Sequence, residues 1–210
     1  MTESLVNYNI LKEATGMSRN KERNESITKA RKEDILRTAI RKFSEKSYQG
    51  TNVSEIAKEL GVSQGTIFWY FETKEKLFKA AFMEEFKAIK LAAASVLQDE
   101  ASSPLDRLRK FISEMLRIYS LRREGCILIL QLLSNSEMHQ ILSIDIINVY
   151  NELYCDLELL FKEAGAANPS LKARNFVALL DGFMIQIVLG LDIGDREVLV
   201  TDILHRYELI

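Results

Sequence analysis

Residues that interrupt helices are rare in this sequence. Its 210 residues include two prolines and nine glycines. Proline cannot continue a helix, and glycine is common just after a helix end. Apolar side chains recur at steps of three and four residues, the period of a helix with one buried face, and alternating strand patterns are scarce. We therefore expect an all-α fold of about nine helices, and the length allows a small domain followed by a larger one.

Charge is unevenly distributed along the chain. Residues 1–78 carry 14 Lys and Arg against 11 Asp and Glu, whereas residues 79–210 carry 14 against 19. A net positive charge in one part of the chain alone suggests that this part binds a polyanion. The first residues are polar and show no sustained apolar period, so we expect residues 1–28 to form a flexible basic arm.

The sequence offers little to an enzyme. Its two histidines, His139 and His205, belong to no metal-binding or catalytic spacing. The two cysteines, Cys126 and Cys155, lie in apolar periodic segments, where a free thiol acts as a small hydrophobic side chain. No glycine-rich phosphate-binding motif is present. We expect no catalytic residue, metal or cofactor, and, since no segment is suited to a membrane or to export, a cytoplasmic location.

A helix-turn-helix is predicted in the first third of the chain. An amphipathic pattern over residues 31–46 indicates the first helix. Asn52 begins a variant of the capping box, so a second helix should follow it and stop at Gly61. Ser63 is suited to cap a short third helix, and the two short helices with their glycine turn have the arrangement of a helix-turn-helix. A long helix is expected next, over residues 74–97.

The short third helix has an unusual outward face. On a helical wheel, Ile67 and Phe71 point toward the preceding helices. The residues that point largely away are Gln64, Thr66, Trp69 and Tyr70. Such side chains suit a DNA groove, because glutamine can pair with adenine and a phenol can donate to a phosphate. Gly65 would let the backbone approach DNA closely, and Lys74 is placed to meet a phosphate. The alternative is that the outward aromatic rings pack beneath the long helix that follows.

Several short motifs follow one another in this region. They are the helix start at 51–57, the Gly-Val-Ser turn at 61–63, the Gly-Thr-Ile-aromatic run at 65–71, and Lys74 with Leu77. Together, residues 31–78 closely resemble the DNA-binding domain of the tetracycline-repressor (TetR) family of bacterial transcription regulators. The resemblance implies a three-helix domain at residues 29–78 with double-stranded DNA as its partner. The implied DNA contacts are Asn52, Gln64, Gly65, Thr66, Trp69, Tyr70 and Lys74. The family usually has tyrosine where this chain has Phe68.

The same resemblance implies a larger C-terminal domain, residues 79–210, for ligand binding and dimerisation. Residues 173–192 look like the family's penultimate helix, and they are apolar around much of the helix circumference. Such a helix is buried either by its own core or by a second copy of the chain. The resemblance favours a homodimer. The candidate interface residues are Ala178, Asp181, Gly182, Ile185 and Leu189.

An effector cavity is also implied by the family likeness, among the helices between residues 74 and 190. Aromatic and methionine side chains suit an adaptable apolar pocket, although each is also explained as ordinary core. The candidates are Met115, Tyr119, Leu130, Met138, Tyr150, Tyr154, Phe176 and Met184. Because the sequence shows no concentration of buried charge there, we expect a mostly apolar or aromatic effector.

The sequence thus predicts a homodimeric, ligand-responsive transcription regulator, most simply a repressor that binds a palindromic operator. Two alternatives stay open. A DNA-binding protein with an architectural or cell-division role would have no cavity for a ligand. A small-molecule carrier would bind its ligand without sequence-specific DNA binding.

Overall fold

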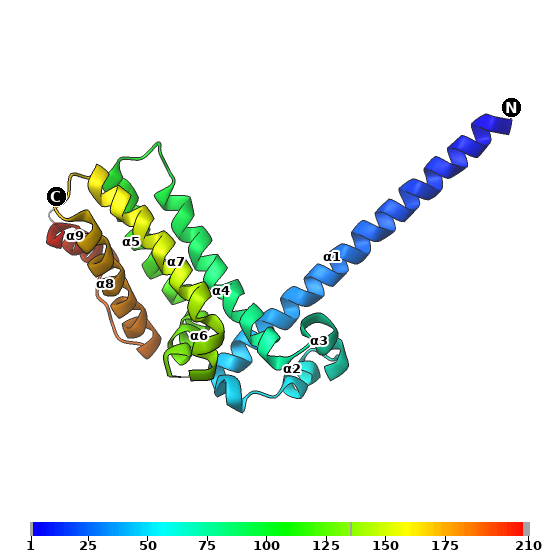
Figure 1. The fold of residues 1–210 in the computed structure, drawn as a ribbon, viewed down its shortest axis with the longest axis horizontal. Coiled ribbons are helices and arrows are strands. Elements are labelled where there is room, and N and C mark those ends of the chain that lie inside the picture. The colour runs from blue at the N-terminus through cyan, green and yellow to red at the C-terminus, as the bar shows by residue number, and fades with distance from the viewer. Residues whose placement is uncertain (1, 135, 208–210) are drawn as a thin grey trace. The chain divides into compact units, whose positions relative to one another are not determined.

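The computed structural model describes residues 2–134 and 136–207, and every regular element in this part of the chain is a helix (Figure 1). The helices are α1 (Thr2–Gly50), α2 (Val53–Glu59), α3 (Gln64–Phe71), α4 (Lys74–Leu97), α5 (Pro104–Leu121), α6 (Arg123–Ser134), α7 (Ser136–Glu163), α8 (Pro169–Leu189) and α9 (Arg196–Arg206). The all-α prediction is confirmed. Among the described residues, no helix combines the length and the apolarity needed to cross a membrane.

The chain divides into two compact units. The first unit holds Asn52–Leu77 together with the chain up to Ala39, and the second holds Ile40–Thr51 together with the chain from Phe78 onward. Three boundaries separate the units: 39/40 lies inside α1, 77/78 lies inside α4, and 51/52 lies between α1 and α2. Residues 40–51, which we had expected in the DNA-binding domain, therefore pack with the C-terminal unit.

The core of the first unit joins α1, α2 and α3. Its buried side chains are spaced at three and four residues on each helix, as the periodicity predicts. They are Ile35, Leu36, Ala39, Val53, Ile56, Ala57, Ile67 and Phe71. The ammonium group of Lys32 lies 5.7 Å from the ring centre of Phe71, close enough for a cation–π contact. This core fixes α3 against α1 and α2 through one face only.

The regular course of α1 ends at Ser47. This residue has φ 62° and ψ 173°, outside the helical range. Thr51 is only 1% exposed, and its hydroxyl lies 3.0 Å from the carbonyl oxygen of Lys42 and 2.7 Å from that of Ser47. A hydroxyl can satisfy carbonyl groups that a helix end leaves without amide partners. The bend lies close to residue 46, where the sequence predicts the first helix to stop.

The segment that we expected to be a flexible basic arm, residues 1–28, is helical from Thr2 and continues into the rest of α1. Side chains 25–33 are exposed. Between residues 2 and 46 the sequence has no proline and one glycine, Gly16, so its local preference favours a helix. A missing apolar period thus excludes packing of this segment against a core but does not exclude a helix. The flexibility of the arm stays a prediction.

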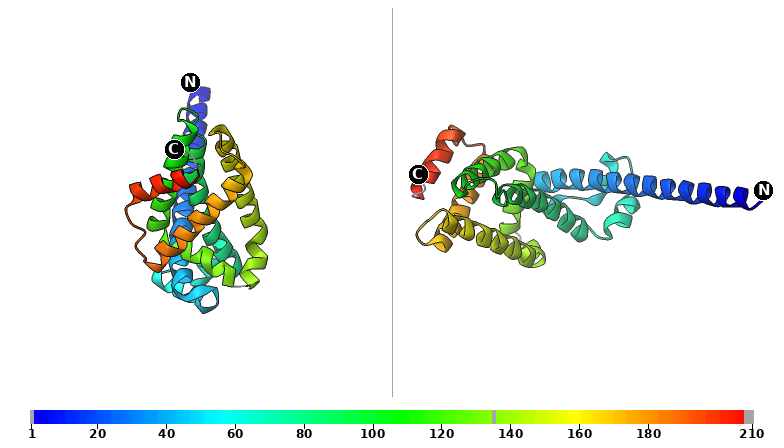
Figure 2. Two further views of the ribbon diagram at one scale, coloured as in Figure 1. Left: turned by 90° about the vertical axis from the view of Figure 1, so that its left-hand side faces the viewer. Right: turned by 90° about the horizontal axis from the view of Figure 1, so that it is seen from above.

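The second unit is a helical bundle with α5 at its centre, since α5 contacts α6, α7, α8 and α9 (Figure 2). Phe111, Phe161 and Phe176 are each at most 1% exposed. The ring centres of Phe111 and Phe176 lie 6.1 Å apart, and those of Phe161 and Phe176 lie 5.3 Å apart. These stacked and edge-to-face contacts join α5, α7 and α8 into one core.

Gly125 lies inside α6 and does not divide two helices. The break falls instead at Arg122, which follows the end of α5. A Cβ atom at position 125 would lie 2.3 Å from Oε2 of Glu85. The Glu85 side chain is buried and pairs with Arg122 at 2.9 Å. Glycine is therefore needed here to make room for a carboxylate from α4, and not to end a helix.

The two cysteines are free and differ in their surroundings. Cys126 is buried, and burial raises the pKa of its thiol to about 12, so it stays protonated and packs as a small hydrophobic residue. Cys155 is exposed on α7. The expectation of a packed thiol thus holds for Cys126 alone.

Candidate functional site

The start of α3 is fixed by local hydrogen bonds. The hydroxyl of Ser63 accepts from the backbone N–H of Thr66 at 3.0 Å, which is the capping bond predicted from the sequence. Gly61 has φ +63°, a left-handed conformation that glycine adopts without the cost other residues meet. A Ser cap and a glycine turn therefore set where α3 begins and how it leaves α2.

The outward face of α3 is open. Trp69 is 73% exposed, while Ile67 and Phe71 are buried on the opposite side. Gln64 and Gly65 are exposed, and Tyr70 is half-buried with its ring centre 4.7 Å from that of Trp69. The wheel prediction is confirmed for Trp69, which does not pack beneath α4. A large aromatic side chain in this position has a surface available for a partner.

Asn52 and Lys74 flank this face in sequence. Asn52 is exposed and precedes α2, but its side chain makes no capping hydrogen bond, so the capping-box prediction was wrong for the side chain. Thr73 caps α4, since its hydroxyl accepts from the backbone N–H of Lys76 at 3.1 Å. Lys74 is half-buried in the first turn of α4, and Thr66 is half-buried in the first turn of α3. Both side chains are therefore only partly accessible to a partner.

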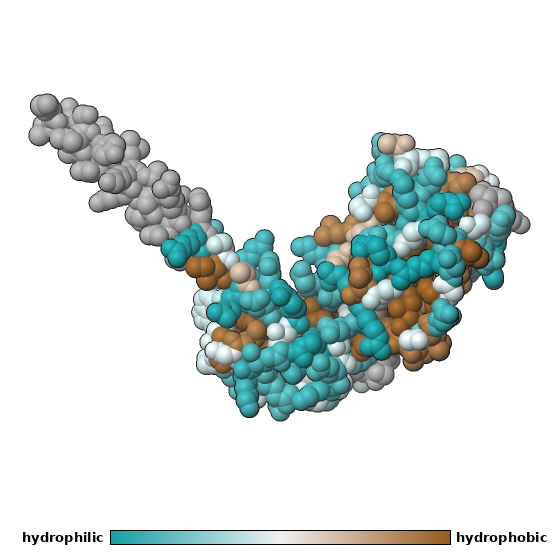
Figure 3. All heavy atoms as spheres, turned by 180° about the vertical axis from the view of Figure 1, so that it is seen from behind, coloured by the Kyte–Doolittle hydropathy of each residue, from teal (hydrophilic) through white to brown (hydrophobic). Residues whose placement is uncertain are grey.

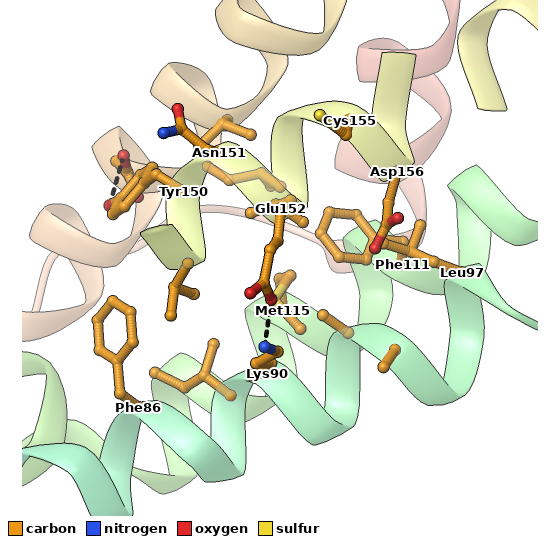
Figure 4. Close-up of a pocket in the computed structure, with 18 of the residues that line it drawn as sticks. Phe86, Lys90, Leu97, Phe111, Met115, Tyr150, Asn151, Glu152, Cys155 and Asp156 are labelled. Carbon is orange, nitrogen blue, oxygen red and sulfur yellow. Dashed lines mark hydrogen bonds and ion pairs between the residues drawn. The ribbon is translucent and has the colours of Figure 1, made fainter. Parts of the chain in front are cut away.

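A cavity of about 780 Å³ lies within the second unit (Figure 4). Its walls come from α4, α5, α7 and α8, with Ile129 from α6. The volume lies in the range of small-molecule sites in proteins. The apolar and aromatic part of the wall includes Phe86, Ala93, Leu97, Phe111, Met115, Tyr119, Val177, Leu180 and Met184.

Asp181 is the charged residue of α8 on this wall. The Tyr150 hydroxyl donates to its carboxylate, with O···O distances of 3.1 and 3.2 Å to the two oxygens. Burial raises the pKa of Asp181 to about 6, and the hydrogen bond from Tyr150 offsets this only in part. Burial together with the Asp181 charge also raises the pKa of the Tyr119 and Tyr150 phenols, which therefore stay neutral.

The remaining charged residues of the cavity come from α4 and α7. The ammonium group of Lys90 on α4 pairs with the carboxylate of Glu152 on α7, as Figure 4 shows. Asp156 lies one turn further along α7 and is exposed. Among the described residues, no three histidine, cysteine or carboxylate side chains lie together in a group that could hold a metal ion.

Four of the predicted ligand residues line this cavity, namely Met115, Tyr119, Tyr150 and Met184. Three others lie elsewhere. Phe176 is packed in the core, Leu130 is half-buried beside it, and Tyr154 lies under the guanidinium of Arg174 at 4.9 Å. The side chain of Met138 lies outside the described residues.

Comparisons with known proteins agree with this architecture. The sequence model of the family "Bacterial regulatory proteins, tetR family" matches residues 35–81, which span the end of α1, the helix-turn-helix and the start of α4. A crystal structure of a TetR-like transcriptional regulator from Rhodococcus sp. RHA1 superposes with a TM-score of 0.71 at 19% identity, covering 84% of this chain and 94% of that one. Residues 35–81 are therefore similar to the DNA-binding region of the TetR family, and the chain shares the fold of a TetR-like regulator.

Curated relatives match this chain over part of its length. The uncharacterised HTH-type transcriptional regulator YerO of Bacillus subtilis is 41% identical over 51 residues, which are 24% of this chain and 18% of YerO. The negative transcriptional regulator IcaR of the biofilm operon icaADBC in Staphylococcus aureus is 26% identical over 85 residues, or 40% of this chain and 45% of IcaR. The chain thus spans less than half the length of these curated relatives. The relatives and structural neighbours named here are transcription regulators and not enzymes.

The predicted interface residues of α8 divide between two faces. Ala178, Ile185 and Leu189 are exposed, Leu189 to 68%, and with the half-buried Gly182 they follow one side of the helix at steps of three and four. Figure 3 shows an apolar area on the C-terminal unit. Asp181 instead lines the cavity. A carboxylate within an otherwise apolar helix is the sequence signal that could have indicated its place at the cavity.

Proposed function

We propose that this chain is a homodimeric TetR-family transcription repressor that binds palindromic DNA through α3 and is released by a small-molecule effector in the cavity of the second unit. The observation that carries the DNA-binding part is the exposed face of α3, where Trp69 stands 73% exposed on a helix whose opposite side is buried. Aromatic, amide and hydroxyl groups on such a face suit base edges and phosphates.

The proposed dimer places two α3 helices on one duplex. The exposed side of α8 supports this part of the proposal, because Ile185 and Leu189 are large apolar side chains open to solvent. Exposed apolar side chains that lie next to one another mark interaction surfaces, whereas single exposed apolar side chains are ordinary. A two-fold dimer would read two half-sites roughly 34–36 Å apart, which is one helical turn of DNA.

The proposed effector acts through α4. This helix supplies six residues of the cavity wall, from Phe86 to Leu97, and only two residues separate its start from the end of α3. A ligand that prefers one position of α4 would shift the protein toward that position, by no more than its difference in affinity for the two states.

DNA binding is tested by electrophoretic mobility shift with DNA from upstream of the protein's own gene and a scrambled duplex as competitor. The Trp69→Ala variant should bind about tenfold more weakly or worse, as expected for the loss of a base-directed contact. Leu159→Ala is the matched control, since Leu159 is also a large exposed apolar residue but lies on α7. Equal shifts by both variants, or no preference for the upstream DNA, would count against the proposal.

A further inference from the structure

The wall of the cavity has an excess of negative charge. It carries three carboxylates, on Glu152, Asp156 and Asp181, and one ammonium group, on Lys90. Lys90 is paired with Glu152. Asp181 receives a hydrogen bond from a neutral phenol and forms no ion pair among the described residues. Inside this cavity, the charge of Asp181 is therefore not balanced by any cation that the protein supplies.

Aromatic rings surround the same space. Phe86 comes from α4, Phe111 and Tyr119 from α5, and Tyr150 from α7. The face of an aromatic ring carries partial negative charge and attracts cations, most strongly where water is displaced. Rings and a carboxylate on one wall are the combination by which proteins bind organic ammonium groups.

We propose that the cavity binds an organic cation, in which an ammonium or amidinium group lies beside Asp181 and an apolar or aromatic body fills the space toward Phe86 and Met115. This inference rests on the proposed effector role of the cavity, and it specifies the charge of the effector. It differs from the sequence-based expectation, which found no concentration of buried charge and so predicted a mostly apolar or aromatic effector.

The physical reason for a cation is the cost of burying charge. A buried carboxylate without a counter-ion is unfavourable, and a ligand that brings the opposite charge removes part of this cost when it binds. A neutral ligand of the same shape would gain the same apolar contacts but would leave Asp181 unbalanced. An anionic ligand would meet a wall that already carries an excess of carboxylates.

The test compares two probes of nearly the same shape, phenyltrimethylammonium and tert-butylbenzene, which differ in a charged nitrogen in place of a carbon. Isothermal titration of the unaltered full-length protein should give an affinity for the cation that is higher by about tenfold or more, as expected for a cation–π contact plus a counter-charge. This comparison does not depend on the folding of any variant. Benzoate serves as the anionic probe and should bind more weakly than either.

Variants then locate the charge. Asp181→Asn keeps the shape and an acceptor for the Tyr150 hydroxyl, and it should remove most of the preference for the cation while leaving the affinity for tert-butylbenzene unchanged. Glu158→Gln removes an exposed carboxylate of α7 that does not line the cavity, and it should change neither affinity. Equal affinities for the two probes, no binding of the cation, or an unaltered preference in Asp181→Asn would overturn the inference.

The same experiment separates the inference from the proposed function. If the cation binds as expected but does not weaken the DNA complex in a mobility shift, the cation site stands and the effector role fails. If tert-butylbenzene binds and releases DNA while the cation does not, the effector role stands and the inference is overturned.

Discussion

Replacing Asp181 with asparagine should change the stability of the protein in a pH-dependent way. The carboxyl group has a pKa of about 3.8 in the unfolded chain, whereas burial raises this pKa to about 6 in the folded protein. Between these two values the unfolded state loses a proton that the folded state retains. Stability therefore falls as pH rises through this window, and it is constant with respect to this group above it.

The magnitude follows from the two pKa values. By linkage, the Asp181 carboxyl group lowers the free energy of unfolding, relative to strongly acidic pH, by about 1.5 kcal/mol at pH 5 and about 3 kcal/mol at pH 8. The asparagine side chain does not ionise, so Asp181→Asn escapes this cost at both pH values. Its amide group carries a pH-independent penalty of about 1 kcal/mol if it lacks an acceptor. The free energy of unfolding of the variant minus that of the unaltered protein should thus increase by about 1.5 kcal/mol from pH 5 to pH 8.

Urea unfolding followed by circular dichroism measures this gain. Both proteins are compared at pH 5 and pH 8 at one fixed protein concentration, because a dimer's midpoint depends on concentration. Glu158→Gln is again the matched control, with no expected change between the two pH values. A stability difference between Asp181→Asn and the unaltered protein that is the same at pH 5 and pH 8 would refute the burial of this carboxylate.

Three further perturbations test other parts of the structure. Gly125→Ala should lower the free energy of unfolding by about 1–3 kcal/mol in thermal or urea unfolding, because the new methyl group displaces the buried carboxylate of Glu85; a neutral or stabilising result would contradict this packing. Ser63→Ala should cost about 1 kcal/mol through the lost cap and weaken DNA binding, and Ser63→Thr should restore most of both. Changing Ile185 and Leu189 to glutamate should shift the protein from dimer to monomer in sedimentation equilibrium, and an unchanged mass would place the dimer interface elsewhere.

The positions of α3 and α4 were predictable because local chemistry fixes them. Ser63 and Thr73 each cap the helix that follows, and Gly61 ends α2 in a left-handed conformation. These signals act over a few residues and can be seen in the sequence without any knowledge of the fold. The exposed face of α3 followed from the same reasoning, since its helical phase is set by its first residue.

Features that depend on tertiary packing were not predictable in this way. A glycine such as Gly125 suggests a helix end, and only the structure shows that it makes room for a carboxylate from α4, 40 residues earlier in the chain. The cavity collects residues from five helices, so periodicity alone could not separate Met115 at its wall from Phe176 in the core. Asp181 was assigned to the partner-facing side of α8 because a wheel shows where a residue points but not which side a neighbouring helix will cover.

Trp69 also makes the protein its own spectroscopic probe. It is the only tryptophan in the chain, so all indole emission comes from the outward face of α3. A ligand that merely fills the cavity of the second unit should leave this emission unchanged, because no tryptophan lines that cavity. Any change in Trp69 fluorescence on adding a cavity ligand would therefore report, without a label, that occupancy of the second unit alters the surroundings of α3.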